Sequence, residues 1–262
     1  MTRIRAFSLV LVLLAWFHEP LTAQTGLARW LDAEVARMPA PTAVYVKHLG
    51  TSEEAGVRAA EHFNSMSVIK VAIMVRAYQL AEQGKLSLDE RVEIARADLR
   101  DGSGVLQYHD LGLRPSIRDL ITEMIITSDN TATDLMVQKI GGVAELNRWL
   151  AESGYGEMKM VGRGFEYRRR LLTLLNPAFG DLTPEDTTAL MYASSDNPLF
   201  ERFAPLFAGE RARWIDVVRD PASRRRLAAE RLKRTSEDPE FWLGDMTVRA
   251  IGRMLEAIER ET

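Results

Sequence analysis

The segment of residues 67–83 is apolar on nearly all sides, and no other feature limits the fold of this chain so strongly. Because such a helix must be covered by other elements, we expect it to lie at the centre of a helical block. Gly84, which follows it, is typical of a helix end. Ser67 begins the helix, and Lys70 lies three residues later on the same face. A serine nucleophile needs a nearby base, so this pair is a candidate catalytic centre.

Apolar periodicity and turn residues predict the elements around this helix. We expect a helix over residues 25–38, strands over 42–49 and 55–60, and helices over 116–127, 131–140 and 143–152. Residues 157–245 hold helical patterns broken by prolines, with one strand at 159–162, and a last helix is expected at 246–259. The order predicts an α+β fold in which a helical block is packed against an antiparallel β-sheet.

The first residues have the layout of a secretory signal peptide. Arg3 and Arg5 precede a short apolar stretch, and a small-residue cleavage site ends at Ala23. We therefore expect a signal peptide over residues 1–23 and one domain over 24–262, with an uncleaved anchor as the alternative. No later run reaches the length of a stable membrane span. Export and the absence of cysteine together favour a periplasmic or secreted protein.

Charge and residue spacing exclude several classes of partner. The net charge of −3 gives no support for nucleic-acid binding. The arginine clusters at residues 168–170 and 224–226 are interpreted as solvated helix faces. The four histidines show no zinc-ligand spacing, and there is no phosphate-binding glycine loop. We expect a monomer with neither metal nor cofactor.

A second short motif, Ser128-Asp129-Asn130, offers another hydroxyl and a carboxamide to the same cleft. The triplet recurs at residues 195–197, where the following proline indicates a helix terminus and turn. The alternative for the first pair is a helix-capping Ser67 with a surface Lys70. The apolar residues after Lys70 favour its burial instead, which would lower the pKa of its amine and suit proton transfer.

Residues 63–70, 102–106 and 124–142 together resemble class A β-lactamases. The resemblance extends over about residues 27–154 and 244–258, and it implies the β-lactamase/transpeptidase-like fold. It implies that Ser67 is the acylated nucleophile and that Lys70 helps to remove its proton. Ser128 would pass a proton to the departing ring nitrogen, and Asn130 would bind the side-chain amide of the substrate.

The resemblance also implies a glutamate that activates the deacylating water, within an Arg-x-Glu-x-x-Leu-Asn pattern. Arg163 and Glu166 fit the start of this pattern, but Arg169 and Arg170 stand where Leu-Asn should be. Glu166 is therefore a candidate for the deacylation base. The alternative is an ion pair between Glu166 and a neighbouring arginine.

Two departures from the family pattern concern the later part of the chain. The Lys-Thr-Gly motif is absent, and it should follow the helix expected at 246–259. We therefore expect the C-terminal strands of the family to be missing and the 262-residue chain alone to be poorly folded or inactive. Residues 176–238 are interpreted as a helical insertion, which would form a lid over the cleft.

The leading functional prediction is an exported serine hydrolase that opens β-lactam rings through an acyl-enzyme on Ser67. The close alternative is a D,D-peptidase or penicillin-binding protein, which is acylated without efficient turnover and acts on D-Ala-D-Ala peptides. A third reading is a catalytically inactive homologue that keeps Ser67 and Lys70 as relics. The expected partner is a small β-lactam or a D-Ala-D-Ala-type peptide.

Overall fold

A computed structural model describes residues 26–260 of the chain, so the predicted signal peptide lies outside the described residues. The helices are α1 (Gly26–Val35), α2 (Ile69–Glu82), α3 (Ile117–Ile126), α4 (Asn130–Lys139), α5 (Val143–Glu152), α6 (Gly164–Thr173), α7 (Pro184–Ser194), α8 (Ala212–Arg219), α9 (Pro221–Glu237) and α10 (Val248–Glu259). The strands are β1 (Val44–Lys47), β2 (Glu54–Val57), β3 (His62–Asn64), β4 (Met158–Met160) and β5 (Gly244–Thr247).

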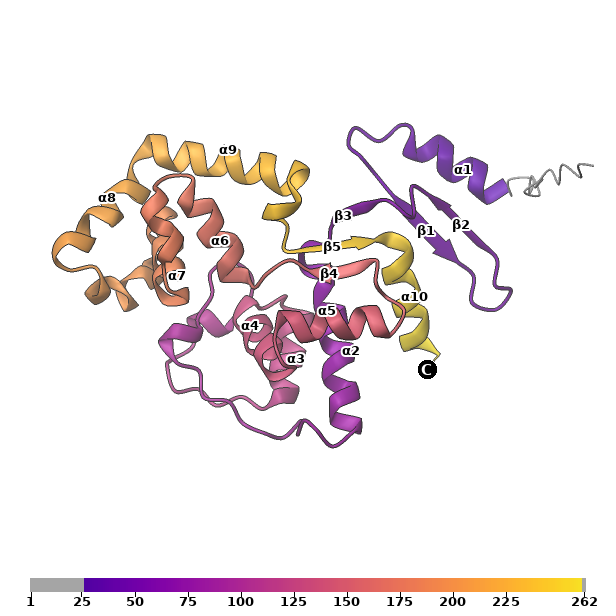
Figure 1. Ribbon diagram of the computed structural model, residues 1–262, viewed down its shortest axis with the longest axis horizontal. Helices are drawn as coiled ribbons and strands as arrows, with labels where there is room; N and C mark the ends of the chain where they lie inside the picture. The colour runs from indigo at the N-terminus through magenta and orange to yellow at the C-terminus, as the bar shows by residue number, and fades with distance from the viewer. Residues whose placement is uncertain (1–25, 261–262) are drawn as a thin grey trace, which may run out of the picture.

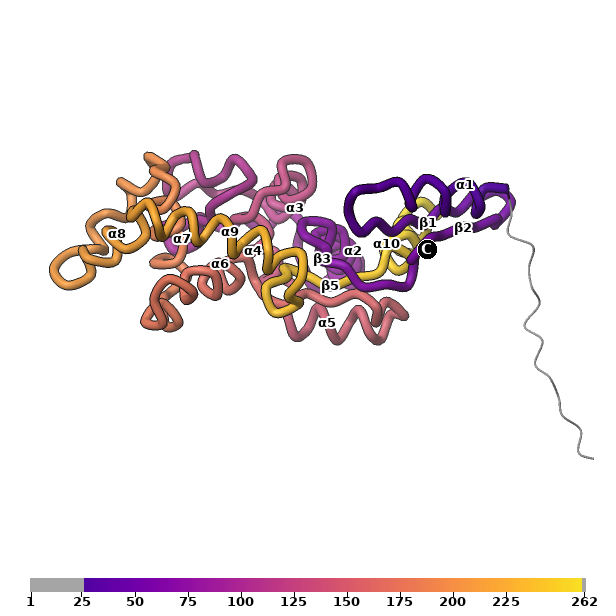
Figure 2. Tube along the Cα trace, turned by 90° about the horizontal axis from the view of Figure 1, so that it is seen from above, coloured from indigo at the N-terminus to yellow at the C-terminus, as the bar shows by residue number. Residues whose placement is uncertain are grey.

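These elements are arranged in three parts along the long axis of an elongated molecule (Figure 1). At one end α1 lies beside the β1–β2 hairpin, and α10 contacts β1. The centre holds α2, α3, α4 and α5 together with a small sheet. Helices α7 and α8 form the other end, and α9 leads back from it toward the small sheet. Figure 2, turned by 90°, shows the same order of parts along the long axis.

The strands form two antiparallel sheets within the described residues. In the first, β1 pairs with β2 and places Val44 opposite Val57. The second has the order β3-β5-β4, and both Phe63 and Met158 lie opposite Met246 of the central strand. The predicted α+β class is confirmed, although the strands are divided between two small sheets.

Helix α2 is the centre of the helical block, as its apolar composition predicts. Ile69, Ala72, Ile73 and Ala77 are fully buried, and the helix contacts α3, α4 and α5. Burial of a side chain such as Ile73 contributes about 1.5–3 kcal/mol relative to exposure. The burial therefore fixes the position of the residues at the start of α2.

Two helix boundaries and one strand differ from the predictions near the candidate site. Helix α2 begins at Ile69, because Met66–Val68 form a separate 3₁₀ turn that contains Ser67. The expected helix at 246–259 loses its first two residues to β5, where Met246 is buried by pairing on both sides. Helix α10 starts only after Thr247, whose Oγ1 accepts a hydrogen bond from the backbone N–H of Ala250 at 3.1 Å. The short strand β3 carries no clear alternation and was not predicted.

Residues 176–238 are largely helical, in agreement with their sequence pattern. Helix α9 is the longest of the described helices, and it contacts α6 and α8. Its first turn contains Pro221, and the carboxylate of Asp220 accepts the backbone N–H of Ser223 at 2.8 Å. No helix within residues 26–260 combines the length and the apolar character needed to cross a bilayer.

Candidate active site

Ser67 lies in the turn between strand β3 and helix α2. Met66, just before it, has a φ of 46°, which is uncommon for a residue with a side chain. The side chain of Asn64 accepts the backbone N–H of Met66 at 3.1 Å, and Ser65 N–H donates to Gly244 O at 2.8 Å. These bonds attach the turn to β3 and β5. The hydroxyl-bearing residue is thereby exposed at the end of a buried helix.

Lys70 connects the start of α2 with the Ser128-Asp129-Asn130 triplet. Its side chain is buried, and its Nζ donates to Ser128 O at 2.5 Å, Ser128 Oγ at 3.0 Å and Asn130 Oδ1 at 3.1 Å. Burial, together with the positive charge of Arg168, lowers the pKa of the Lys70 amine to about 8 against the opposing effects of Asp129 and Asp134. The amine is therefore closer to neutrality at physiological pH than an exposed lysine.

The triplet is shaped by Asp129, which caps helix α4. Asp129 Oδ1 accepts the backbone N–H of Ala132 at 2.9 Å, and Oδ2 accepts the N–H of Leu106 at 2.8 Å. Gly104 lies against this carboxylate: a Cβ there would be 2.2 Å from Asp129 Oδ2, and φ is +107°. Ser128, with φ 56°, turns the chain into α4. The residues 102–104 loop and the triplet thus form one rigid unit.

Asn130 faces the same loop. Its backbone N–H donates to Ser103 O at 3.1 Å, and its side-chain Nδ2 donates to Asp101 O at 2.9 Å. With Lys70 at its Oδ1, the carboxamide is held from both sides. This orientation keeps Asn130 at the wall of the cleft described below.

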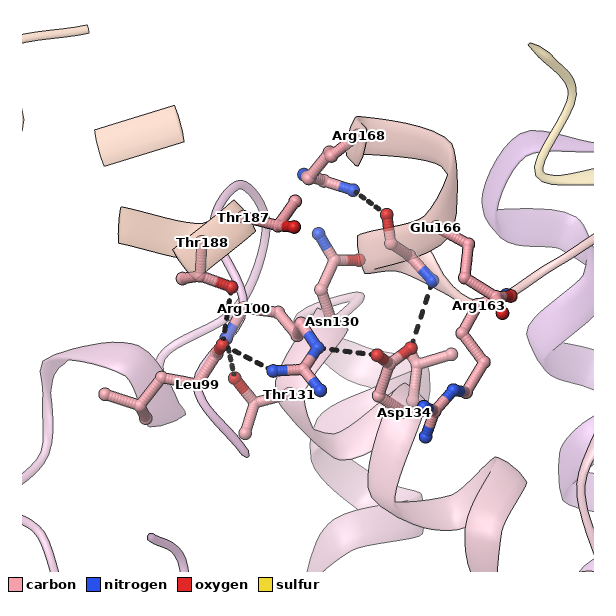
Figure 3. Close-up of polar contacts among 12 residues, drawn as sticks. Leu99, Arg100, Asn130, Thr131, Asp134, Arg163, Glu166, Arg168, Thr187 and Thr188 are labelled. Carbon is pink, nitrogen blue, oxygen red and sulfur yellow. Dashed lines mark hydrogen bonds and ion pairs between the residues drawn. The ribbon is translucent and has the colours of Figure 1, made fainter. Parts of the chain in front are cut away.

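Arg100 and Arg168 connect helix α4, helix α6 and the loop of residues 99–104 to one another (Figure 3). Arg100 Nε donates to Asp134 Oδ2 at 2.6 Å, with both side chains no more than 3% exposed, and Asp134 Oδ1 accepts the N–H of Gly164 at 3.1 Å. Arg168 forms an ion pair with Asp101 and donates to Asp101 O at 3.1 Å. Arg168 was expected on a solvated helix face. That expectation is wrong, because its charge is neutralised inside the structure.

A cleft of about 110 Å³ opens in front of Ser67. Its walls come from the turn after β3, from the residues 102–104 loop, from the starts of α4 and α6 and from α9. The lining residues are Asn64, Met66, Ser67, Gly102, Ser103, Asn130, Tyr167, Arg168, Arg231 and Leu243. The structure therefore brings Ser67 and Asn130 to one cleft. At the base of the cleft, Lys70 donates hydrogen bonds to both Asn130 and Ser128.

Glu166 is the one predicted site residue that neither lines this cleft nor takes part in the hydrogen bonds at its base. Its carboxylate accepts the backbone N–H of Arg163 at 2.7 Å and so caps the first turn of α6. It lines a different surface pocket, shared with residues of α5 such as Asn147. The role of Glu166 in deacylation stays a prediction, and the described geometry gives its carboxylate a helix-capping position.

Sequence reasoning missed two other residues of the cleft. Burial raises the pKa of the Tyr167 phenol, against the opposing effects of the nearby Arg231 and Arg168 charges. Arg231 reaches the cleft from α9. Neither residue belongs to a local motif, so only the three-dimensional arrangement identifies them. Among residues 26–260 there is also no group of three acidic or histidine side chains placed to hold a metal ion.

A model of the β-lactamase enzyme family matches residues 26–197. The chain belongs to this family. β-Lactamase L2 of Stenotrophomonas maltophilia is 30% identical, over 64% of this chain and 51% of that protein. β-Lactamase BRO-1 of Moraxella catarrhalis is 30% identical, over 45% of this chain and 43% of that protein. The chain thus spans about half the length of the curated relatives it matches.

Solved structures agree with this membership. The structure of PBP-A superposes with a TM-score of 0.52 at 28% identity, covering 63% of this chain and 66% of PBP-A. The family match includes Ser67, Lys70, Ser128 and Asn130, and it ends before helices α8 and α9. Arg231 is therefore a part of the cleft that lies outside the region matched by the β-lactamase enzyme family.

Proposed function

We propose that this chain is an enzyme with a serine nucleophile, which opens β-lactam rings by forming an acyl-enzyme on Ser67. The observation that carries the proposal is Lys70, a buried amine with a lowered pKa, hydrogen-bonded to Ser128 and Asn130 one helical turn after Ser67. Membership in the β-lactamase enzyme family supports the same chemistry.

The reaction step follows from these positions. Ser67 Oγ attacks the lactam carbonyl carbon, a C–O bond forms and the ring C–N bond breaks. The serine proton goes to neutral Lys70, and a proton reaches the ring nitrogen through the Ser128 hydroxyl, which lies 3.0 Å from Lys70 Nζ. Asn130 holds the side-chain amide of the substrate. No co-reactant is required, because the nitrogen gains the proton that the serine loses.

A specific observation favours slow deacylation as a second candidate. No carboxylate is among the residues that line the described cleft, and Glu166 caps helix α6 instead. Without a base for the hydrolytic water, the acyl-enzyme would persist, as expected for a penicillin-binding protein or D,D-peptidase acting on D-Ala-D-Ala peptides. Hydrolysis of the adduct, the β-lactamase reaction, requires Glu166 or another group to reach the ester.

We further propose that the protein is exported and acts as a monomer in the periplasm or outside the cell. The residues 1–23 pattern supports export. N-terminal sequencing of protein recovered from a periplasmic fraction should begin at Gln24. Recovery of the protein only from the cytoplasm, with Met1 retained, would contradict export.

The acylation is tested by the intact mass of the purified protein before and after minutes of incubation with benzylpenicillin, beside Ser67→Ala. We expect an adduct of the mass of penicillin that Ser67→Ala lacks. Its persistence for hours would support the penicillin-binding reading, and its loss within seconds with release of penicilloate would support hydrolysis. An unchanged mass with no Ser67-dependent loss of penicillin would refute the proposal and favour an inactive homologue.

A further inference from the structure

A second pocket continues the Ser67 cleft on the side of helix α9. It has a volume of about 360 Å³ and lies between the C-terminal part of α7 and α9. Gly102 and Arg231 line both this pocket and the Ser67 cleft, so the two hollows adjoin at these residues. We name it the α7–α9 pocket.

Gly102 lies where the two hollows adjoin, and the close packing there leaves no room for a side chain. A Cβ at this position would lie 2.9 Å from Asn130 Nδ2 and 2.9 Å from Arg168 Nη2, and its φ is +92°. Asn130 is the residue that holds the side-chain amide of the substrate under the proposed function. The α7–α9 pocket therefore adjoins the Ser67 cleft close to Asn130.

The lining of the pocket combines an apolar floor with a polar rim. Leu171 is fully buried, Leu227 is 7% exposed, and Met191 completes the floor. Ser194, Asn197 and Arg224 stand at the rim. An arm with methylene groups would cover the floor, because removing apolar groups from water favours binding.

The charges at the rim leave one cation for a ligand. Arg224 forms a bidentate ion pair with Asp196, with Nη2 2.6 Å from Oδ1. Asp101, which also lines the pocket, is paired with Arg168. No carboxylate in residues 26–260 forms an ion pair with Arg231, which is exposed at the junction of the two hollows. The junction thus carries one positive charge that the described structure does not neutralise.

We propose that the α7–α9 pocket is a binding subsite for the acyl arm of the substrate, and that Arg231 selects arms that carry a carboxylate. This inference rests on the proposed function of Ser67. Helix α9, which carries Arg231, lies outside the segment matched by the family. A substrate with a short neutral arm would fill only the Ser67 cleft.

The test uses two penicillins whose arms differ only at the terminal group, on the full chain. One carries an adipoyl arm with a free terminal carboxylate, and the other carries the methyl ester of that carboxylate. We expect the free acid to acylate Ser67 about fivefold faster, the upper end for an ion pair in contact with water. Arg231→Gln should remove the difference, whereas Arg225→Gln, at an α9 position that does not line the pocket, should preserve it.

A second variant tests the pocket itself. Ala228→Phe fills the α7–α9 pocket from α9, and it should slow both adipoyl compounds relative to an acetyl-arm penicillin. Equal acylation rates for the acid and the ester in the parent protein would overturn the inference while leaving the Ser67 chemistry in place. So would a preference for the acid that survives Arg231→Gln.

Binding to the Ser67→Ala variant, measured by ligand-observed NMR, separates the subsite from the reaction. We expect the adipoyl acid to bind about fivefold more tightly than its ester, and Arg231→Gln to abolish this preference. If no adduct forms on the parent protein but the binding preference is present, the proposed function fails and the subsite stands. Equal or undetectable binding of the two compounds to Ser67→Ala refutes the subsite.

Discussion

Acylation of Ser67 should depend steeply on pH if Lys70 accepts the serine proton. Burial lowers the pKa of the Lys70 amine to about 8. With that pKa, about one lysine in eleven is neutral at pH 7 and about ten in eleven at pH 9. Because only the neutral amine can accept a proton, the acylation rate constant should rise about tenfold from pH 7 to pH 9 and then level off.

The assay is the rate of adduct formation with benzylpenicillin, quenched with acid at short times and measured by intact mass between pH 6 and 10. Ser67→Ala provides the blank, and far-UV circular dichroism checks that the fold persists over the range. Lys70→Arg should reduce the rate by about 10²–10⁴ and remove the rise, because arginine stays protonated. A parental rate that is flat from pH 6 to 10, or that falls over this range, would refute Lys70 as the base.

Three further substitutions test the structure around the site. Asp134→Ala leaves a buried guanidinium without its partner and should lower the free energy of unfolding in urea by about 3–5 kcal/mol. Asp196→Ala, at an exposed pair, should lower it by less than about 1 kcal/mol. Equal effects of the two substitutions would contradict this account. Gly104→Ala should lower Tm more than Gly112→Ala, because both have positive φ but a Cβ meets other atoms only at Gly104. Glu166→Gln should leave the lifetime of the acyl adduct unchanged, and a much longer lifetime would place its carboxylate in deacylation.

Much of the helical fold could be predicted from periodicity, and the errors have local causes. Helices α3 and α5 begin and end within a residue of the predicted bounds, since a capping Ser116 and a Gly-Gly pair delimit them. The strands β3 and β5 are too short to show alternation, and their pairing is decided by partners far along the chain. Thr247 ends β5 and caps the start of α10, whereas apolar periodicity alone extended the predicted helix back to residue 246.

The candidate site likewise has features that the local sequence predicts and features that it does not. The burial of Lys70 was predictable because the residues after it are apolar, and the structure confirms it. The burial of Arg168 was not predictable, since its partner Asp101 lies 67 residues earlier and no local pattern links them. Arg231 is a still clearer case, because α9 is brought to the cleft by long-range contacts, among them its packing against α6 and the hydrogen bond from Asn64 to Thr235 O. Motifs indicate which groups react, whereas long-range contacts decide which groups surround them.

The strained backbone of the site supports a separation between chemistry and substrate choice. Met66 and Ser128 have positive φ, which costs about 1–2 kcal/mol for a residue with a side chain. Both are held by contacts within the family-matched region, through Asn64 and Lys70. Helix α9 is bonded to this centre through its backbone, because Asn64 Nδ2 donates to Thr235 O at 3.0 Å, whereas the Arg231 side chain forms no ion pair within residues 26–260. Substitutions of the Arg231 side chain should therefore alter which substrates acylate Ser67, while the pH dependence set by Lys70 stays the same.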